Sequence, residues 1–217
     1  MGRAKLPRKS TSIDMTAMCD VAFLLLSFFI LTTKFKPSEA VAVTIPKSVA
    51  AKVAPSKDIV QVIIDKDGKV FLEMDDEEIK ENIATALNGS KNLGLDVKAF
   101  RKTPFFGAPF GALKAFIALP EDQRKGNLLP GIPVKDTANN ELTEWMAQVR
   151  AAYAATSKKP NLLLKGDNLA KFPAFKSVVT AFKKNDFLKF QMVTTPEGIP
   201  VGTELWKKAQ SGEKREE

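Results

Sequence analysis

Residues 15–33, MTAMCDVAFLLLSFFILTT, form a long apolar stretch whose one charged residue is Asp20. A helix rises about 1.5 Å per residue, so this stretch would extend about 28 Å as a helix, close to the thickness of the hydrocarbon core of a bilayer. The eleven residues after Asp20 are apolar except for Ser27, and Pro37 prevents a simple continuation of the helix. The stretch therefore predicts a transmembrane helix over residues 15–33.

Two other interpretations of this stretch stay open. A core helix of a soluble domain would carry polar residues along one face, whereas the residues after Asp20 are apolar all round. A cleaved signal peptide also has a basic start and an apolar stretch, and Ala40-Val41-Ala42 fits a cleavage site, although it lies well beyond Leu31. We favour an uncleaved single-pass anchor.

The basic residues around the stretch predict its orientation. Residues 1–10 contain four Lys or Arg and no acid, and only two lysines closely follow the stretch. Because basic residues are enriched in cytoplasmic segments, residues 1–14 are expected in the cytoplasm. The remainder would then lie on the far side, which in a bacterial cell is the periplasm.

The composition excludes several classes of chemistry. The 217 residues include no His and one Cys, so His-based catalysis, a Cys-based zinc site and an internal disulfide are excluded. The net charge of +8 is scattered along the chain without a basic stripe between aromatic residues, which argues against a nucleic-acid-binding protein. No nucleophile and base pair can be named, so we expect no enzyme activity, no catalytic residue, no metal and no cofactor.

Asp20 is the one carboxylate within the apolar stretch, and it is the candidate functional residue there. A carboxylate inside a membrane span costs about 2.5–3.5 kcal/mol on insertion scales, and burial in hydrocarbon favours its protonated form. Asp20 could therefore carry protons, or, at roughly 9 Å from the start of the span, it could simply reach headgroup water. Thr16, Leu24 and Ser27 share its helix face at positions i−4, i+4 and i+7. This weakly polar stripe predicts contacts with other transmembrane helices.

Residues 13–21, IDMTAMCDV, resemble the signature of the ExbD/TolR family, which reads approximately I-N-V-T-P-L-V-D-V. Asp14 and Ala17 stand where Asn and Pro are usual, and the aspartate, here Asp20, is retained. Two later segments are also similar to the family. These are Val43-Thr44-Ile45-Pro46-Lys47-Ser48, which resembles V-x-L-P-x-[AS], and LLLKGD at residues 162–167 with the helix and strand that follow.

The resemblance implies a subunit of a proton-driven motor in a bacterial inner membrane. Members act as homodimers whose single helices sit inside a pentameric ring of multi-pass ExbB-like subunits, so Thr16, Leu24 and Ser27 would face that ring. Asp20 would take up and release protons, and the periplasmic domain would act on a TonB-like transducer that energises outer-membrane transport. Residues Val43–Ser48 would form the partner-binding linker. TolR-like relatives serve outer-membrane integrity through a TolA-like partner.

The rest of the chain predicts an α+β fold, a small two-layer sandwich with helices on one side of a mixed sheet. Residues 34–57 are expected to be a linker, in which 41–45 could form an edge strand or pair with a partner chain. Residues 58–198 would form the domain. Its expected elements are a hairpin of 59–65 and 69–74, a helix from 75 to Asn88-Gly89, a helix from 138 to Pro160, a strand at 161–166, a helix at 171–185 and a strand at 187–194.

Residues 90–137 do not fit this pattern and are interpreted as an insertion. Its stretch TPFFGAPFG at residues 103–111 is predicted to be an aromatic loop. The phenylalanines would either pack as a satellite core or form an exposed partner surface. Residues 199–217 are expected to be a mobile tail. A membrane-tethered scaffold or binding protein, in which Asp20 is incidental, is the alternative from a different functional class.

Overall fold

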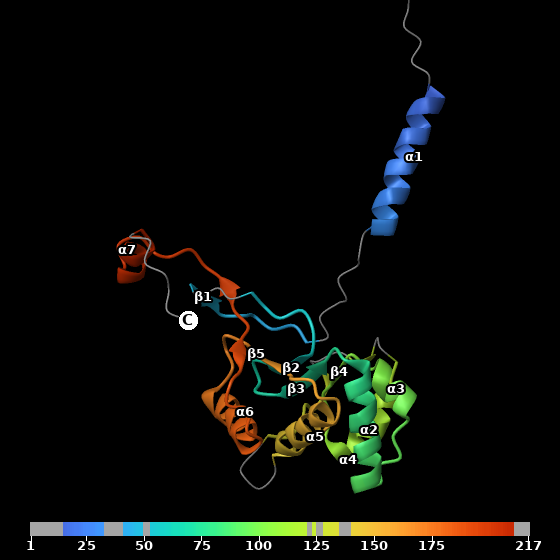
Figure 1. Cartoon of the computed structure of the whole chain (residues 1–217), viewed down its shortest axis with the longest axis vertical. Coiled ribbons are helices and arrows are strands. Elements are labelled where there is room, and N and C mark those ends of the chain that lie inside the picture. The colour runs from blue at the N-terminus through green and yellow to red at the C-terminus, as the bar shows by residue number, and fades with distance from the viewer. Residues whose placement is uncertain are drawn as a thin grey trace, which may run out of the picture. The chain divides into compact units, whose positions relative to one another are not determined.

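The computed structural model describes residues 15–32, 41–49, 53–120, 123–124, 128–134 and 140–210. The chain divides into two compact units, residues 1–38 and 39–217 (Figure 1). In the first unit, helix α1 (Met15–Thr32) covers the predicted span, and Thr33 lies outside the described residues. None of the α1 residues is buried, which argues against the core-helix interpretation.

The second unit contains a five-stranded mixed sheet. Its strands are β2 (Ile59–Ile64), β3 (Val70–Met74), β4 (Phe105–Phe106), β5 (Asn161–Gly166) and β6 (Gln191–Met192). Their order is β4-β3-β2-β5-β6, with β3 antiparallel to its neighbours and β5 parallel to both β2 and β6. The predicted mixed sheet and the hairpin of β2 and β3 are confirmed.

Local chemistry explains why the hairpin turns where it does. The side-chain Oδ1 of Asp65 accepts the backbone N–H groups of Asp67 and Lys69 at 2.9 and 2.8 Å. Gly68 has a φ of 82°, a conformation that residues with a Cβ rarely adopt. The side-chain hydrogen bonds and the glycine together reverse the chain between β2 and β3 over the five residues 65–69.

The helices form the second layer of the domain. They are α2 (Glu77–Lys91), α3 (Val97–Lys102), α4 (Phe110–Ala118), α5 (Glu141–Ala155) and α6 (Phe172–Lys184). Figure 1 shows α2, α5 and α6 on one side of the sheet, as predicted. The sheet residues Val62, Leu72 and Leu164 occupy one face by register and are fully buried, as is Trp145 of α5.

The predicted end of the first domain helix at Asn88-Gly89 is wrong. Helix α2 continues through both residues to Lys91 and ends at Asn92, whose φ of 51° is left-handed. The Asn88 side chain does not cap α2 but binds the backbone of Leu95, accepting its N–H at 2.7 Å and donating to its carbonyl at 3.0 Å. Asn88, which the sequence pattern suggests as the end of the helix, instead makes a contact with the loop that follows α2.

The predicted aromatic loop at residues 103–111 is also wrong. Phe105 and Phe106 form β4 and extend the sheet, and Phe110 begins α4. The Trp145 ring lies 5.2 Å from that of Phe106 and 5.3 Å from that of Phe110, between ring centroids. The phenylalanines of residues 90–137 are all buried. They are Phe100, Phe105, Phe106, Phe110 and Phe116. They belong to the core of the domain and do not form an exposed partner surface.

The predicted last strand at residues 187–194 needs correction. The last strand is only Gln191–Met192, because the chain turns at Asp186, whose φ is 63°, before it reaches β5. Phe172 of α6 is 71% exposed, since the buried face of this helix runs through Val178, Ala181 and Phe182. The predicted tail contains helix α7 (Glu204–Gln210).

Candidate functional site on the membrane helix and its connection

The residues predicted to share one face with Asp20 lie on successive turns of α1. Thr16, Asp20, Leu24 and Ser27 are spaced by four, four and three residues, which keeps them within one side of a helix with 3.6 residues per turn. All but Ser27 are exposed, and Ser27 is intermediate. The helix therefore presents its acid and its hydroxyls on its surface.

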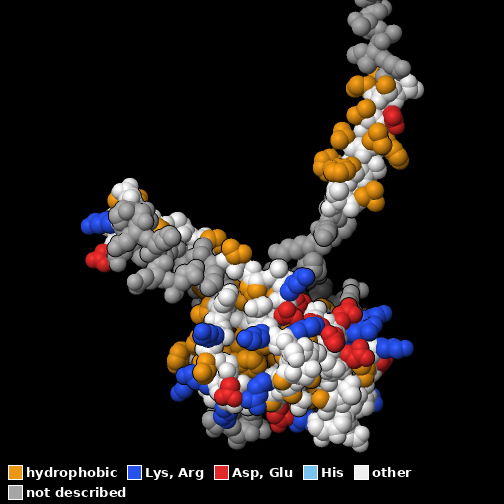
Figure 2. Space-filling model, in the orientation of Figure 1, with side chains coloured by type: hydrophobic (Ala, Val, Ile, Leu, Met, Phe, Trp, Pro, Cys, Tyr) orange, Lys and Arg blue, Asp and Glu red, His pale blue; other side chains and the backbone are white. Residues whose placement is uncertain are grey.

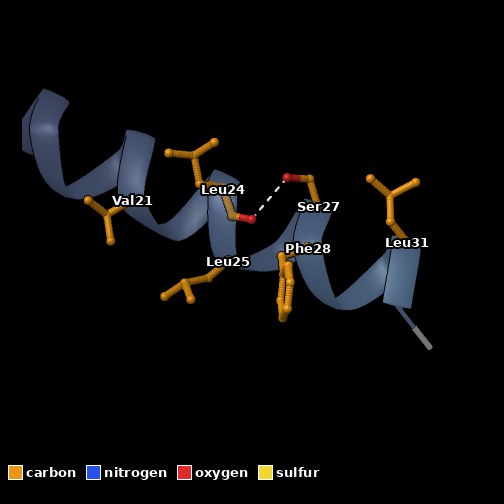
Figure 3. A pocket seen from close by; sticks show the side chains of 6 residues that line it. All are labelled: Val21, Leu24, Leu25, Ser27, Phe28 and Leu31. Carbon is orange, nitrogen blue, oxygen red and sulfur yellow. Dashed lines mark hydrogen bonds between the residues drawn. The ribbon is translucent and has the colours of Figure 1, made fainter.

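The Ser27 hydroxyl is satisfied within the helix. Its Oγ donates to the carbonyl of Leu24 at 3.0 Å (Figure 3). Hydroxyl groups on apolar helices commonly back-bond in this way, which lets them enter hydrocarbon without an unpaired donor. Ser27 is therefore compatible with a membrane and keeps its oxygen near the helix surface.

A shallow apolar hollow runs along α1 immediately after Asp20. Figure 3 shows Leu24, Ser27 and Leu31 on one side of it and Val21, Leu25 and Phe28 on the other. Asp20 is not among the lining residues. A hollow between two rows of side chains can receive side chains of a second helix, which is how helices pack in membranes.

The predicted linker segment Val43–Ser48 is held against the domain by backbone hydrogen bonds. The N–H of Thr44 donates to Oδ2 of Asp167 at 2.8 Å, and the N–H of Asn168 donates to the carbonyl of Thr44 at 2.8 Å. Val41, just before this segment, is 2% exposed. The connection from α1 thus reaches the domain at Val41 and docks beside the end of β5.

Residues 47–48 of this segment form the short strand β1 (Lys47–Ser48), which pairs in parallel with β7 (Thr195–Pro196). Thr195 and Glu197 donate their N–H groups to the carbonyls of Pro46 and Ser48, each at 2.9 Å. The strand therefore begins later than the predicted edge strand at 41–45. Its pairing partner is the C-terminal part of the same chain.

Sequence reasoning missed the two groups that hold this segment, Asp167 and the backbone of residues 195–197. Asp167 directly follows the buried strand β5, and its Oδ1 also accepts the N–H of Leu169 at 2.8 Å. An aspartate after a buried strand is a usable sign of a turn cap. No residue pattern near 195–197 points to a strand partner 148 positions earlier in the chain.

Within the described ranges, no three His, Cys, Asp or Glu side chains come close enough together to hold a metal ion.

A comparison with protein families matches residues 7–106 to the family described as "Biopolymer transport protein ExbD/TolR". Over these residues the chain is similar to the ExbD/TolR family. The match includes α1 with Asp20, the segment 43–48 and the hairpin of β2 and β3. No curated protein and no solved structure matched the chain.

The ExbD/TolR match confirms the resemblance stated from residues 13–21 and 43–48. It ends at Phe106, within the segment interpreted as an insertion, and residues 138–196 lie outside it. Together with the apolar helix α1, the ExbD/TolR match supports a membrane-anchored protein of biopolymer transport.

Proposed function

We propose that this chain is a non-enzymatic subunit of a proton-driven motor of the ExbB–ExbD type, in which Asp20 carries the proton. The observation that supports this proposal is the position of one carboxylate within the apolar helix of the family-matched segment. The chain has no histidine, so proton exchange near neutral pH inside the span would depend on that carboxylate. The single-pass topology would place residues 1–14 in the cytoplasm and the domain in the periplasm of a bacterial inner membrane.

In this proposal, α1 packs inside a ring of multi-pass ExbB-like subunits, together with the α1 of a second copy. The apolar hollow would receive side chains of a neighbouring helix, while Asp20 would face the proton path beside Thr16, Leu24 and Ser27. Protonation removes the charge on Asp20 and so lowers the cost of facing hydrocarbon. Alternate protonation and release would then drive rotation or tilting of α1, and the domain would pass the motion to a TonB-like transducer.

The test of the proton role is Asp20→Asn, which keeps the size of the side chain but removes its titration. We expect the variant to remain in the membrane with its partners and to lose energised outer-membrane transport. Asp67→Asn is the matched control, because Asp67 is an exposed turn residue between β2 and β3. Uptake at the normal rate in Asp20→Asn cells would contradict the proposal.

Two alternatives predict different outcomes. In a membrane-tethered scaffold, replacing residues 15–33 by an unrelated single-pass anchor would preserve function, whereas a motor subunit would lose it. In a TolR-like subunit, the Asp20→Asn variant would retain nutrient uptake but would weaken the outer membrane. Purification of the intact complex in mild detergent distinguishes an ExbD-like from a TolR-like subunit. The first would be recovered with a TonB-like transducer and the second with a TolA-like transducer.

A further inference from the structure

The outward side of α6 combines lysines with exposed apolar side chains. Phe172, Lys176, Val179 and Lys183 follow one another at i, i+4, i+7 and i+11, which places them along one side of the helix. The buried residues Val178, Ala181 and Phe182 lie on the opposite side. We call the exposed surface the α6 face and define it by Leu169, Lys171, Phe172, Lys176, Lys183 and Leu188, all of which are exposed.

The apolar members of the α6 face are large and strongly exposed. Leu169, Phe172 and Leu188 are 72%, 71% and 77% exposed. Figure 2 shows apolar and basic side chains close together on the side of the domain where α6 lies. Single exposed apolar residues are common on soluble proteins, whereas larger exposed apolar patches rimmed by polar residues mark interaction surfaces.

The charge of this region is entirely of one sign over a long stretch. Residues 168–185 contain four lysines and no acid. The next acid, Asp186, is paired with Arg150 of α5, with an Nη1 to Oδ2 distance of 2.7 Å. The α6 face therefore attracts anions, and its exposed Phe and Leu side chains favour a partner with an apolar layer beneath an anionic surface.

The connection to the membrane helix docks directly beside this face. Asn168, which donates its N–H to Thr44, immediately precedes Leu169. Nine covalent steps join Thr32 at the end of α1 to the buried Val41, so that connection spans at most about 30 Å. A short connection keeps the domain at a high effective concentration near the bilayer.

We propose that the α6 face docks on the anionic phospholipid surface of the membrane in which α1 is anchored. The lysines would contact headgroup phosphates while Phe172, Leu169 and Leu188 enter the interface, as in other basic surfaces with aromatic and leucine side chains. The short tether, the excess of lysine and the exposed apolar side chains all favour an anionic membrane surface as the partner of the α6 face. The tether also holds the domain within reach of the membrane surface.

The experiment uses the full chain in nanodiscs of phosphatidylcholine, with or without phosphatidylglycerol. The native cysteine is removed by Cys19→Ser, and an environment-sensitive NBD dye is attached to Leu188→Cys on the α6 face. Docking is expected to shift the dye emission to the blue and to protect the dye from dithionite only when phosphatidylglycerol is present. High salt should reverse both effects.

The decisive variant is the double charge reversal Lys176→Glu with Lys183→Glu. Each lysine near an anionic surface contributes roughly fivefold to binding, so the ratio of docked to free domain should fall by roughly 30-fold or more. The matched control is Lys98→Glu with Lys102→Glu, which changes the net charge equally on exposed residues of α3. Thermal unfolding of each variant checks that the domain remains folded.

Four outcomes would overturn the proposal. These are an unchanged dye signal in both kinds of nanodisc, an equal blue shift in both, an equal loss of signal in the α3 control, and a blue shift that requires an added soluble polyanion. The last outcome would assign the α6 face to an acidic peptide or an anionic polysaccharide instead of a lipid surface.

Discussion

Asp76 shows how one side chain can join two distant parts of the domain. It is the N-cap of α2, and its Oδ1 accepts the N–H groups of Glu78 and Ile79 at 2.8 and 3.2 Å. Its Oδ2 accepts a hydrogen bond from Nζ of Lys158 at 2.7 Å. Partial burial alone would raise the pKa of Asp76, but the hydrogen bonds from Lys158, Ile79 and Glu78 lower it below the ordinary value.

At the residue scale, we therefore predict that Asp76→Ala destabilises the domain by about 1–2 kcal/mol at pH 7, the usual cost of a lost N-cap. Because the folded-state pKa of Asp76 is lowered, its ionised form stabilises the fold above the unfolded-state pKa, and this contribution is lost as pH falls through the folded-state pKa. The difference from the native chain should thus shrink below about pH 4. Urea unfolding at pH 7 and pH 3 measures it.

Two comparisons sharpen this prediction. Lys158→Met removes the cation but leaves the cap, so it should cost less than Asp76→Ala, because exposed ion pairs contribute little. A loss of stability in Asp76→Ala that is equally large at pH 3 would show that packing, and not the ionised cap, is responsible.

At the scale of elements, Gly107 allows the chain between β4 and α4 to pass close to Phe71 of β3. A Cβ added at this position would overlap the ring of Phe71, which is fully buried in β3. Leu129 closes the same site from another side, at 3.5 Å from that Cβ position. The position therefore has space for a hydrogen atom only, and the surrounding core cannot move aside freely.

We predict that Gly107→Ala destabilises the domain by about 1–3 kcal/mol, the range for overpacking a well-packed core. Gly111→Ala is the matched control, because Gly111 lies within α4 and nothing lies within 4 Å of its added Cβ. The control should be neutral or stabilising, since alanine favours helices over glycine. Equal unfolding midpoints for the two variants would contradict the close approach of Phe71.

At the scale of the whole molecule, the segment that follows the membrane helix and the C-terminal part of the chain meet on the domain. Asp167 and Asn168 hold one end of this segment at Thr44, and β7 holds the other end at Lys47 and Ser48. The contacts at its two ends are joined by the short run of chain between Thr44 and Lys47. They should therefore open together as one local unit.

We predict that Asp167→Ala accelerates hydrogen exchange of the Thr44 amide and also of the Thr195 and Glu197 amides, which donate to the same segment. Mass spectrometry of the full chain in detergent measures this exchange by peptide. Asp67→Ala, an exposed turn carboxylate, serves as the control. Faster exchange confined to Thr44 would show that the two ends of the segment open independently.

Local patterns were sufficient for several elements. The span with Asp20, the hairpin of β2 and β3, a helix between residue 138 and Pro160 (observed as α5, Glu141–Ala155) and the strand Asn161–Gly166 were predicted because each depends on nearby residues. Apolar periodicity, turn residues and caps act over a few positions. The face that carries Asp20, Thr16, Leu24 and Ser27 likewise follows from helix geometry alone.

What the sequence determined by itself was therefore the anchor with its single acid, the mixed α+β character of the domain and the resemblance that the family match confirmed. Only the tertiary structure decided that Phe105 and Phe106 complete a sheet edge, that Phe172 faces outward, and that residues 43–48 dock on Asp167 and β7. These features depend on pairings between segments far apart in the chain. Such pairings follow from the packing of the whole domain, which no local pattern encodes.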